Sequence, residues 1–263
     1  MFAPRTLEVL RGALVGTPTA PGDDGRGSEA IFRSLLGGIV SLEYEPGQMV
    51  SERELMARTG AGRATLRQAV TRLADLGLIT PHARKGLMIA PLDLLDVASV
   101  YDARRAIERA VVRLAAQRAT RDQIAALRSE SDSAAGLHDE PAAFAAQDMR
   151  LHLAIAAAAR NRYLEDALTR ILPVSARLWA RLHREVGGDR RFMFHHGAIV
   201  EAIGARDPEA AEAATTAHLE SARQILAGTF VPLAERQAPL AYGAGPVLVT
   251  VEGEGQGEER PDG

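Results

Sequence analysis

The sequence predicts a mainly α-helical protein with an N-terminal winged helix-turn-helix and a C-terminal bundle of about six helices. Three helix-periodic segments and two short strand-like segments follow one another within about 60 residues, which is the layout of a winged helix-turn-helix. From residue 93 onward almost every segment has the i, i+3, i+4 apolar period of a helix. Aromatic residues make up only 4% of the chain, which favours helices packed through small and aliphatic side chains.

The composition restricts the classes of protein to consider. A chain of 263 residues is long enough for two domains, each with its own core. The absence of cysteine excludes disulfides, thiolate metal sites and a cysteine nucleophile. No apolar run approaches the roughly 20 residues that a membrane-spanning helix needs, and the first residues lack the pattern of a secretory signal. We therefore expect a cytoplasmic protein with no membrane partner.

The net charge of −3 conceals an uneven distribution. Residues 30–92 contain eight Arg and Lys against five Asp and Glu, a local net charge of +3. Residues 231–263 contain two arginines against six acids, a net charge of −4. The N-terminal part is thus basic enough to bind nucleic acid, although the charge does not require it.

Four regions follow from the pattern. We predict a flexible arm over residues 1–27, a winged helix-turn-helix over 28–92, a helical domain over 93–230 and a disordered acidic tail over 231–263.

In the second region, apolar residues from Ile31 to Ile39 form one stripe of a first helix. Ser51 and Glu54 have the spacing of a capping box, which opens a second helix. A third helix spans about residues 62–76 and ends at a glycine. Residues 78–80 and 87–89 are strand candidates joined by a basic hairpin.

The helical domain divides at residues that cap or begin helices, such as Asn161 and Pro208, and we expect a kink at Pro173. The six predicted helices lie near residues 93–119, 121–138, 141–159, 161–185, 189–205 and 207–228.

The third helix carries a pair of arginines that suits DNA. Arg63 and Arg67 are four residues apart and share one helix face, from which arginine can contact guanine edges or phosphates. We expect Arg53 to contact the phosphate backbone and the wing tip to enter the minor groove. The full set of expected DNA-contacting residues is Arg53, Arg63, Thr65, Arg67, Lys85 and Gly86. A solvated basic face on a small three-helix domain remains the alternative.

The helical domain contains a set of potential metal ligands. Asp148 and His152 are spaced i, i+4 and point from one face of a helix, while His196 and His218 lie on the two last helices. Three imidazoles and one carboxylate suit zinc, and also nickel or manganese. Read singly, an Asp–His pair at this spacing is usually a surface ion pair, and each histidine could be a core or a solvent-facing residue.

The N-terminal motifs resemble those of a known family. The run from Pro46 to Leu55, PGQMVSEREL, resembles the PG-x-x-L-SE-R-E-L signature of the GntR family of bacterial transcription regulators, and the residues from Gly60 to Leu78 are similar to its recognition-helix region. The resemblance implies DNA contacts by the arginines named above and by Gly86. The family usually has hydroxyl residues flanking the first recognition-helix arginine, whereas this chain has Gly62 and Ala64.

Residues 97–228 resemble the FCD effector domain of the FadR subfamily, and six helices rather than seven resemble its VanR-like branch. This resemblance implies that Asp148, His152, His196 and His218 bind a divalent metal and that a small organic acid completes the coordination through its carboxylate. It also implies that Arg104 and Asn161 contact this effector. Arg104 could instead pair with Glu108 along one helix face, and Asn161 could instead cap its helix.

Together these observations predict a homodimeric transcription regulator of a metabolic operon that binds double-stranded operator DNA, responds to a small carboxylate and is not an enzyme. A metal-dependent hydrolase that uses the Asp/His set is one alternative, although no well-placed Glu general base accompanies the ligands. A dimeric scaffold whose winged domain binds protein is the other alternative.

Overall fold

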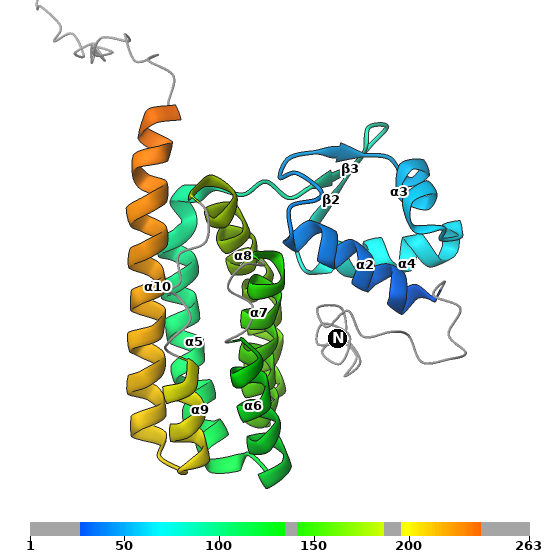
Figure 1. The fold of residues 1–263 in the computed structure, drawn as a ribbon. Helices are drawn as coiled ribbons and strands as arrows, with labels where there is room; N and C mark the ends of the chain where they lie inside the picture. Colours follow the sequence, from blue (N-terminus) through cyan, green and yellow to red (C-terminus); the bar gives the residue numbers. More distant parts are fainter. Residues whose placement is uncertain (1–26, 135–140, 187–195, 238–263) are drawn as a thin grey trace, which may run out of the picture.

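The structure is a computed structural model that describes residues 27–134, 141–186 and 196–237. It contains a small N-terminal domain with a sheet and a larger domain of long helices (Figure 1). Residues 1–26 of the arm predicted over 1–27, and residues 238–263 of the tail predicted over 231–263, lie outside the described residues. The expected mainly helical fold with a winged helix-turn-helix is confirmed.

The N-terminal winged domain contains three helices and a small antiparallel sheet. The helices are α2 (Ser28–Val40), α3 (Glu52–Thr59) and α4 (Arg63–Asp75). The strands are β1 (Met49–Val50), β2 (Ile79–His82) and β3 (Gly86–Ile89), in the order β1-β3-β2. β2 and β3 form the predicted hairpin, whereas β1 was not predicted, because a two-residue strand leaves no alternation to recognise.

Local signals in the sequence set the ends of these helices. The Ser51 hydroxyl accepts a hydrogen bond from the Glu54 main-chain N–H, and the Glu54 carboxylate accepts one from the Ser51 N–H, so the predicted capping box is present. Gly60 ends α3 with a φ of 68°, a left-handed conformation that glycine adopts without strain. The apolar faces of α2, α3 and α4 meet in a core that includes Leu35, Leu55 and Leu66.

The helical domain has, in its described residues, the six α-helices that the sequence predicts. A short 3-10 turn, η1 (Leu94–Asp96), precedes the first of them. The helices are α5 (Val97–Arg118), α6 (Arg121–Ala134), α7 (Pro141–Ala158), α8 (Arg162–Val186), α9 (His196–Gly204) and α10 (Pro208–Gln237).

Two of these helices differ from expectation in extent. α10 continues to Gln237, past the predicted domain boundary at residue 230. The first residues of the helix predicted over 189–205 lie outside the described part, in which α9 begins at His196. α8 continues through Pro173, and the kink expected at this residue stays a prediction.

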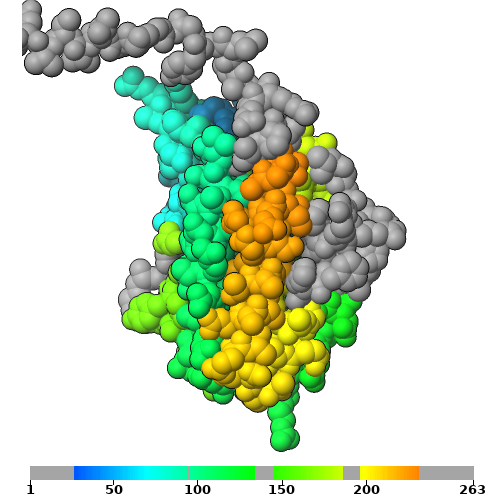
Figure 2. Space-filling view, turned by 90° about the vertical axis from the view of Figure 1, so that its left-hand side faces the viewer, coloured from blue at the N-terminus to red at the C-terminus, as the bar shows by residue number. Residues whose placement is uncertain are grey.

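The long helices lie roughly parallel, and α5 and α10 run side by side on one face (Figures 1 and 2). α7 and α8 pack on each other and on α5, so buried side chains of these three helices and of α10 meet inside the bundle. α2 of the winged domain packs against α7 and α8. Within the described residues, no helix combines the length and the apolar character needed to cross a bilayer.

Candidate functional site

Four potential metal ligands meet inside the helical domain. Asp148 and His152 come from α7, His196 is the first residue of α9, and His218 lies on α10. All four side chains are buried, and one ligand atom from each lies within 4.8 Å of the others. Residues separated by up to 70 positions in the chain thus form one cluster, as the sequence analysis expected for a metal site.

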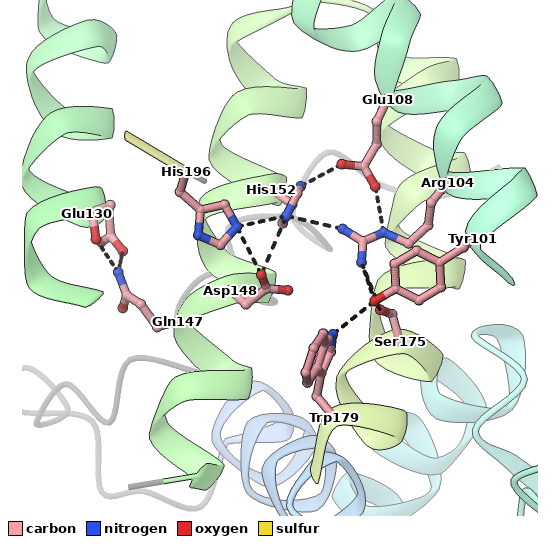
Figure 3. A network of polar contacts seen from close by, with 10 residues as sticks. All are labelled: Tyr101, Arg104, Glu108, Glu130, Gln147, Asp148, His152, Ser175, Trp179 and His196. Carbon is pink, nitrogen blue, oxygen red and sulfur yellow. Dashed lines mark hydrogen bonds and ion pairs between the residues drawn. The ribbon is translucent and has the colours of Figure 1, made fainter. Parts of the chain in front are cut away.

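The atoms that face one another in this cluster are those that bind metals. Asp148 Oδ1 lies 3.1 Å from His196 Nε2 and 3.6 Å from His152 Nε2. The two Nε2 atoms lie 3.3 Å apart (Figure 3). The rings of His196 and His218 have their centroids 4.4 Å apart. Unprotonated ring nitrogens repel each other at such a distance unless a proton or a cation lies between them.

A second carboxylate orients His152. Its Nδ1 atom lies 2.6 Å from Glu108 Oε2 on α5, so the Nδ1–H group donates to Glu108 and Nε2 faces the other ligands. A carboxylate that holds the far nitrogen of a metal-binding histidine fixes its tautomer and its ring orientation. From the sequence, Glu108 was expected only as a partner of Arg104. The i, i+4 spacing was the available signal, but it did not indicate that the pair is buried.

Charges inside the cluster balance the cost of burial. Burial by itself would raise the pKa of Asp148, but the adjacent His152 and His196 hold it well below its usual value. Burial would lower the pKa of His152, but Glu108 and Asp148 outweigh burial and raise it to about 9. For His218, burial and the two neighbouring imidazoles all lower the pKa. His152 must therefore lose a proton before its Nε2 can bind a cation.

Arg104 extends the cluster into a polar network. Its side chain is fully buried, and its Nε donates to Glu108 Oε1 at 2.6 Å. Nη1 donates to the Ser175 hydroxyl at 2.8 Å, and Nη2 lies 3.1 Å from His152 Nε2. The Arg104–Glu108 pair that we considered as a surface pair exists, but it is buried because α7 and α8 cover it. A buried guanidinium beside a metal cluster is suited to bind a carboxylate.

Two aromatic side chains close the far side of this network. The Tyr101 hydroxyl lies 3.3 Å from the Ser175 hydroxyl and accepts a hydrogen bond from the Trp179 indole N–H at 2.9 Å (Figure 3). The Trp179 side chain is buried. Tyr101 lies three residues before Arg104 on α5, so their proximity follows from the i, i+3 spacing. Ser175 comes from α8, 71 positions along the chain from Arg104, and no pattern in the sequence indicated this contact.

The four residues fit a divalent cation. Two donors bound to one zinc ion at about 2.1 Å each lie no more than about 4.2 Å apart, close to the spread of these atoms. The donor set of three imidazoles and one carboxylate suits first-row divalent metals, and Glu108 presents His152 in the required tautomer.

The arginines expected to contact DNA lie on the outside of the winged domain. Arg63 is the first residue of α4, and Arg67 follows one turn later; both are exposed. The Arg67 side chain is 68% exposed and makes a loose ion pair with Glu52, at 3.6 Å. Arg53 is exposed on α3, and Thr65 is half-buried on α4. An exposed, basic N-terminal end is typical of a recognition helix.

The wing lies between β2 and β3, where Lys85 is exposed. Gly86 has a φ of 100°, and a Cβ atom at this position would lie 2.7 Å from the Val50 carbonyl oxygen. The close approach of β1 therefore requires glycine at residue 86, independently of any contact with DNA.

Two families match the two domains. Residues 28–89 match the family described as bacterial regulatory proteins, gntR family, and residues 99–221 match the FCD domain. The HTH-type transcriptional repressor NanR from Citrobacter rodentium is 30% identical over 220 residues, which cover 74% of this chain and 83% of NanR. The chain belongs to the GntR family of transcription regulators. It is therefore a DNA-binding regulator rather than an enzyme.

Other GntR relatives cover a similar share of the chain. The Nta operon transcriptional regulator of Aminobacter aminovorans is 29% identical over 186 residues, 69% of this chain and 85% of the relative. A structure of Escherichia coli McbR/YncC superposes with a TM-score of 0.68 at 14% identity, covering 76% of this chain and 97% of McbR/YncC. A GntR regulator from Rhodococcus sp. RHA1 gives a TM-score of 0.61 at 22% identity, covering 77% and 98%. These structures share the fold.

Asn161 directly precedes α8. Its side-chain oxygen accepts hydrogen bonds from the main-chain N–H groups of Tyr163 and Leu164, at 3.2 and 3.4 Å, and so caps the start of α8. Asn161 therefore has the capping role that was the alternative to effector contact. Its contact with an effector stays a prediction.

Proposed function

We propose that this GntR regulator binds operator DNA as a homodimer and that a small organic acid, bound at a metal held by the FCD domain, controls its affinity for DNA. The observation that carries the proposal is the buried cluster of one carboxylate and three imidazoles directly beside a buried arginine. An anion that reaches this cluster meets both a cation site and a guanidinium.

In this proposal Asp148, His152, His196 and His218 hold the cation, with zinc as the first candidate and nickel or manganese as alternatives. A bound divalent cation supplies a Lewis-acid centre that accepts a carboxylate oxygen. Glu108 keeps Nε2 of His152 directed at the cation, and the Arg104 guanidinium orients the second carboxylate oxygen through charge-assisted hydrogen bonds.

The DNA half of the proposal rests on α4 and the wing. Arg63 and Arg67 enter the major groove, Arg53 binds phosphate, and Lys85 contacts the minor groove beside the wing. Two copies related by a two-fold axis read the two halves of a short palindrome. Such a regulator acts in the cytoplasm, where its operator lies. Relatives named as regulators of the Nta and Uxu operons support control of an operon.

A screen of small acids tests the effector half. We expect that a subset of mono- and dicarboxylic acids raises the melting temperature of Zn²⁺-loaded protein and leaves metal-free protein unchanged, because a ligand that binds only the folded state stabilises it. His218→Ala, which removes one proposed ligand, should lose the response. Equal stabilisation of loaded and metal-free protein by every acid that binds would contradict a metal-centred effector site.

A further inference from the structure

Three arginines on α8 are spaced seven residues apart: Arg170, Arg177 and Arg184. Seven residues make about two helical turns, so the three side chains leave α8 from nearly the same side at intervals of about 10 Å. We refer to these three residues as the arginine ladder. Its regular spacing covers most of the length of α8.

Each member of the ladder donates a hydrogen bond to a main-chain carbonyl group of the winged domain. Arg184 also pairs with the Glu45 carboxylate. The carbonyl acceptors, in the order of the arginines, belong to Asp75, Ala90 and Leu42.

These acceptors lie at the points where the winged domain changes direction. Asp75 is the last residue of α4, the proposed recognition helix, and its carbonyl group belongs to the helix end that lacks internal partners. Ala90 follows β3 and begins the link to the helical domain, and Leu42 lies in the turn after α2. A single helix thus contacts the recognition helix, the link and the first turn of the winged domain.

The opposite side of α8 faces the effector network. Ser175 accepts a hydrogen bond from Arg104, and Trp179 donates one to Tyr101. Arg177 is two residues after Ser175 and therefore lies about 200° around the helix from it. α8 consequently has the polar network of the proposed effector site on one side and the winged domain on the other.

We propose that α8 transmits the state of the effector site to the winged domain, with the arginine ladder as the contact that holds or releases that domain. This inference rests on the proposed function and adds the path of regulation to it. A carboxylate that draws Arg104 away from Ser175 changes the support of α8 on its inner side and thereby the position of the ladder.

Arg177, the middle member of the ladder, makes the docking of the winged domain on α8 sensitive to small changes in α8. The Arg177 side chain is 1% exposed, and within the described residues it has no carboxylate partner and its Nε has no hydrogen-bond acceptor. Burial lowers the pKa of this guanidinium to about 10. A buried cation without a counter-charge disfavours the docked arrangement, so less free energy separates docked from released domains than in a fully paired interface.

A double-mutant cycle in metal-free, full-length protein tests the ladder. Ser175→Ala perturbs the inner side of α8, and Arg177→Met removes the central contact while keeping much of the buried volume. The readout is hydrogen exchange, followed by mass spectrometry, in residues 72–78 and 87–92 of the winged domain. Arg181→Met is the matched control, because Arg181 lies on the same helix and pairs with Glu185 of α8 itself.

We expect Ser175→Ala to speed exchange in these two segments, and the size of this effect to change by about twofold or more in the Arg177→Met background but not in the Arg181→Met background. Arg184→Gln, at a partly exposed position, provides the same comparison if Arg177→Met does not fold. An effect of Ser175→Ala that is equal in all backgrounds, or that never reaches the winged domain, would overturn the proposal.

Adding Zn²⁺ to the wild-type protein separates this inference from the proposed function. Slower exchange around residues 148–152 together with altered exchange in the winged-domain segments is the expected result. Slower exchange around the cluster alone contradicts the coupling through α8. Unchanged exchange everywhere contradicts the metal site, and the double-mutant cycle, which needs no metal, then still decides the ladder.

Discussion

The His152 imidazole is the side chain on which the proposed site depends most. Glu108 holds its Nδ1 at 2.6 Å, and its Nε2 faces Asp148, His196 and Arg104. A ring held in this way has to lose its Nε2 proton but does not have to turn before it binds a cation, so the affinity for metal should depend on Glu108, which orients the ring.

Glu108→Gln tests this dependence. The substitution keeps the shape of the side chain but removes the charge that fixes the His152 tautomer, so we expect the affinity for Zn²⁺ to fall by about 10- to 100-fold. Competition with a chromophoric chelator measures the affinity, and Glu212→Gln on α10 is the control, because Glu212 pairs with Arg109 at the surface. An unchanged affinity in Glu108→Gln would show that the orientation of His152 does not matter.

The capping box of α3 gives a prediction about pH. The main-chain and side-chain hydrogen bonds from Ser51 lower the pKa of Glu54 below its usual value. A lowered pKa in the folded state contributes stability above the unfolded pKa, about 4.3, and this contribution is lost as the pH falls. Ser51→Ala should therefore destabilise the protein by about 1 kcal/mol near neutral pH, and by less below about pH 4, in urea unfolding. A difference that grows as the pH falls would contradict the capping role.

At the scale of single residues, the sequence could predict the metal ligands but not their surroundings. The i, i+4 spacing of Asp148 and His152 requires that they share a helix face, whatever the fold. The burial of Arg104 and Glu108 depends on α7 and α8, which approach from elsewhere in the chain, and a charged i, i+4 pair is typical of an exposed surface. The spacing therefore indicated the Arg104–Glu108 pair, whereas its burial depends on long-range packing.

At the scale of elements, α4 is the helix that defines the regulator. Arg67 is largely exposed and only loosely paired with Glu52, so its guanidinium can turn to DNA at little cost. We expect Arg67→Ala to weaken binding to the operator by at least about tenfold and to leave Zn²⁺ affinity unchanged, because one good arginine contact to guanine contributes about 1–3 kcal/mol. Fluorescence anisotropy with a labelled duplex measures the loss.

Arg121→Ala, at an exposed arginine on α6, is the control for this substitution. Normal operator binding by Arg67→Ala would mean that α4 is not the recognition helix.

The elements themselves were largely predictable from local signals. The capping box, Gly60 and Gly77 fix the ends of α3 and α4 through short-range geometry, and the structure retains them. β1 was not predicted, because this two-residue strand is defined only by its pairing with β3. α10 extends to Gln237, past the predicted boundary, because helix ends are the part of an element that a sequence pattern locates least precisely.

At the scale of the whole molecule, the two domains meet along α8. α2 packs on this helix, and the arginine ladder reaches three segments of the winged domain. Linkage requires that an acid which changes the affinity for operator also binds with a different affinity in the presence of operator. Regulation is therefore a property of the contact between the domains as much as of either site.

The most direct test of the account is the dissociation constant for a duplex from the promoter beside this gene, measured with Zn²⁺-loaded protein with and without an acid that stabilises it. We predict that affinity falls steeply with salt, as phosphate contacts require, and that the acid changes it by about 5- to 150-fold. His218→Ala should bind the same duplex without responding to the acid. An identical dissociation constant with and without every stabilising acid, or no binding at low ionic strength, would contradict the account.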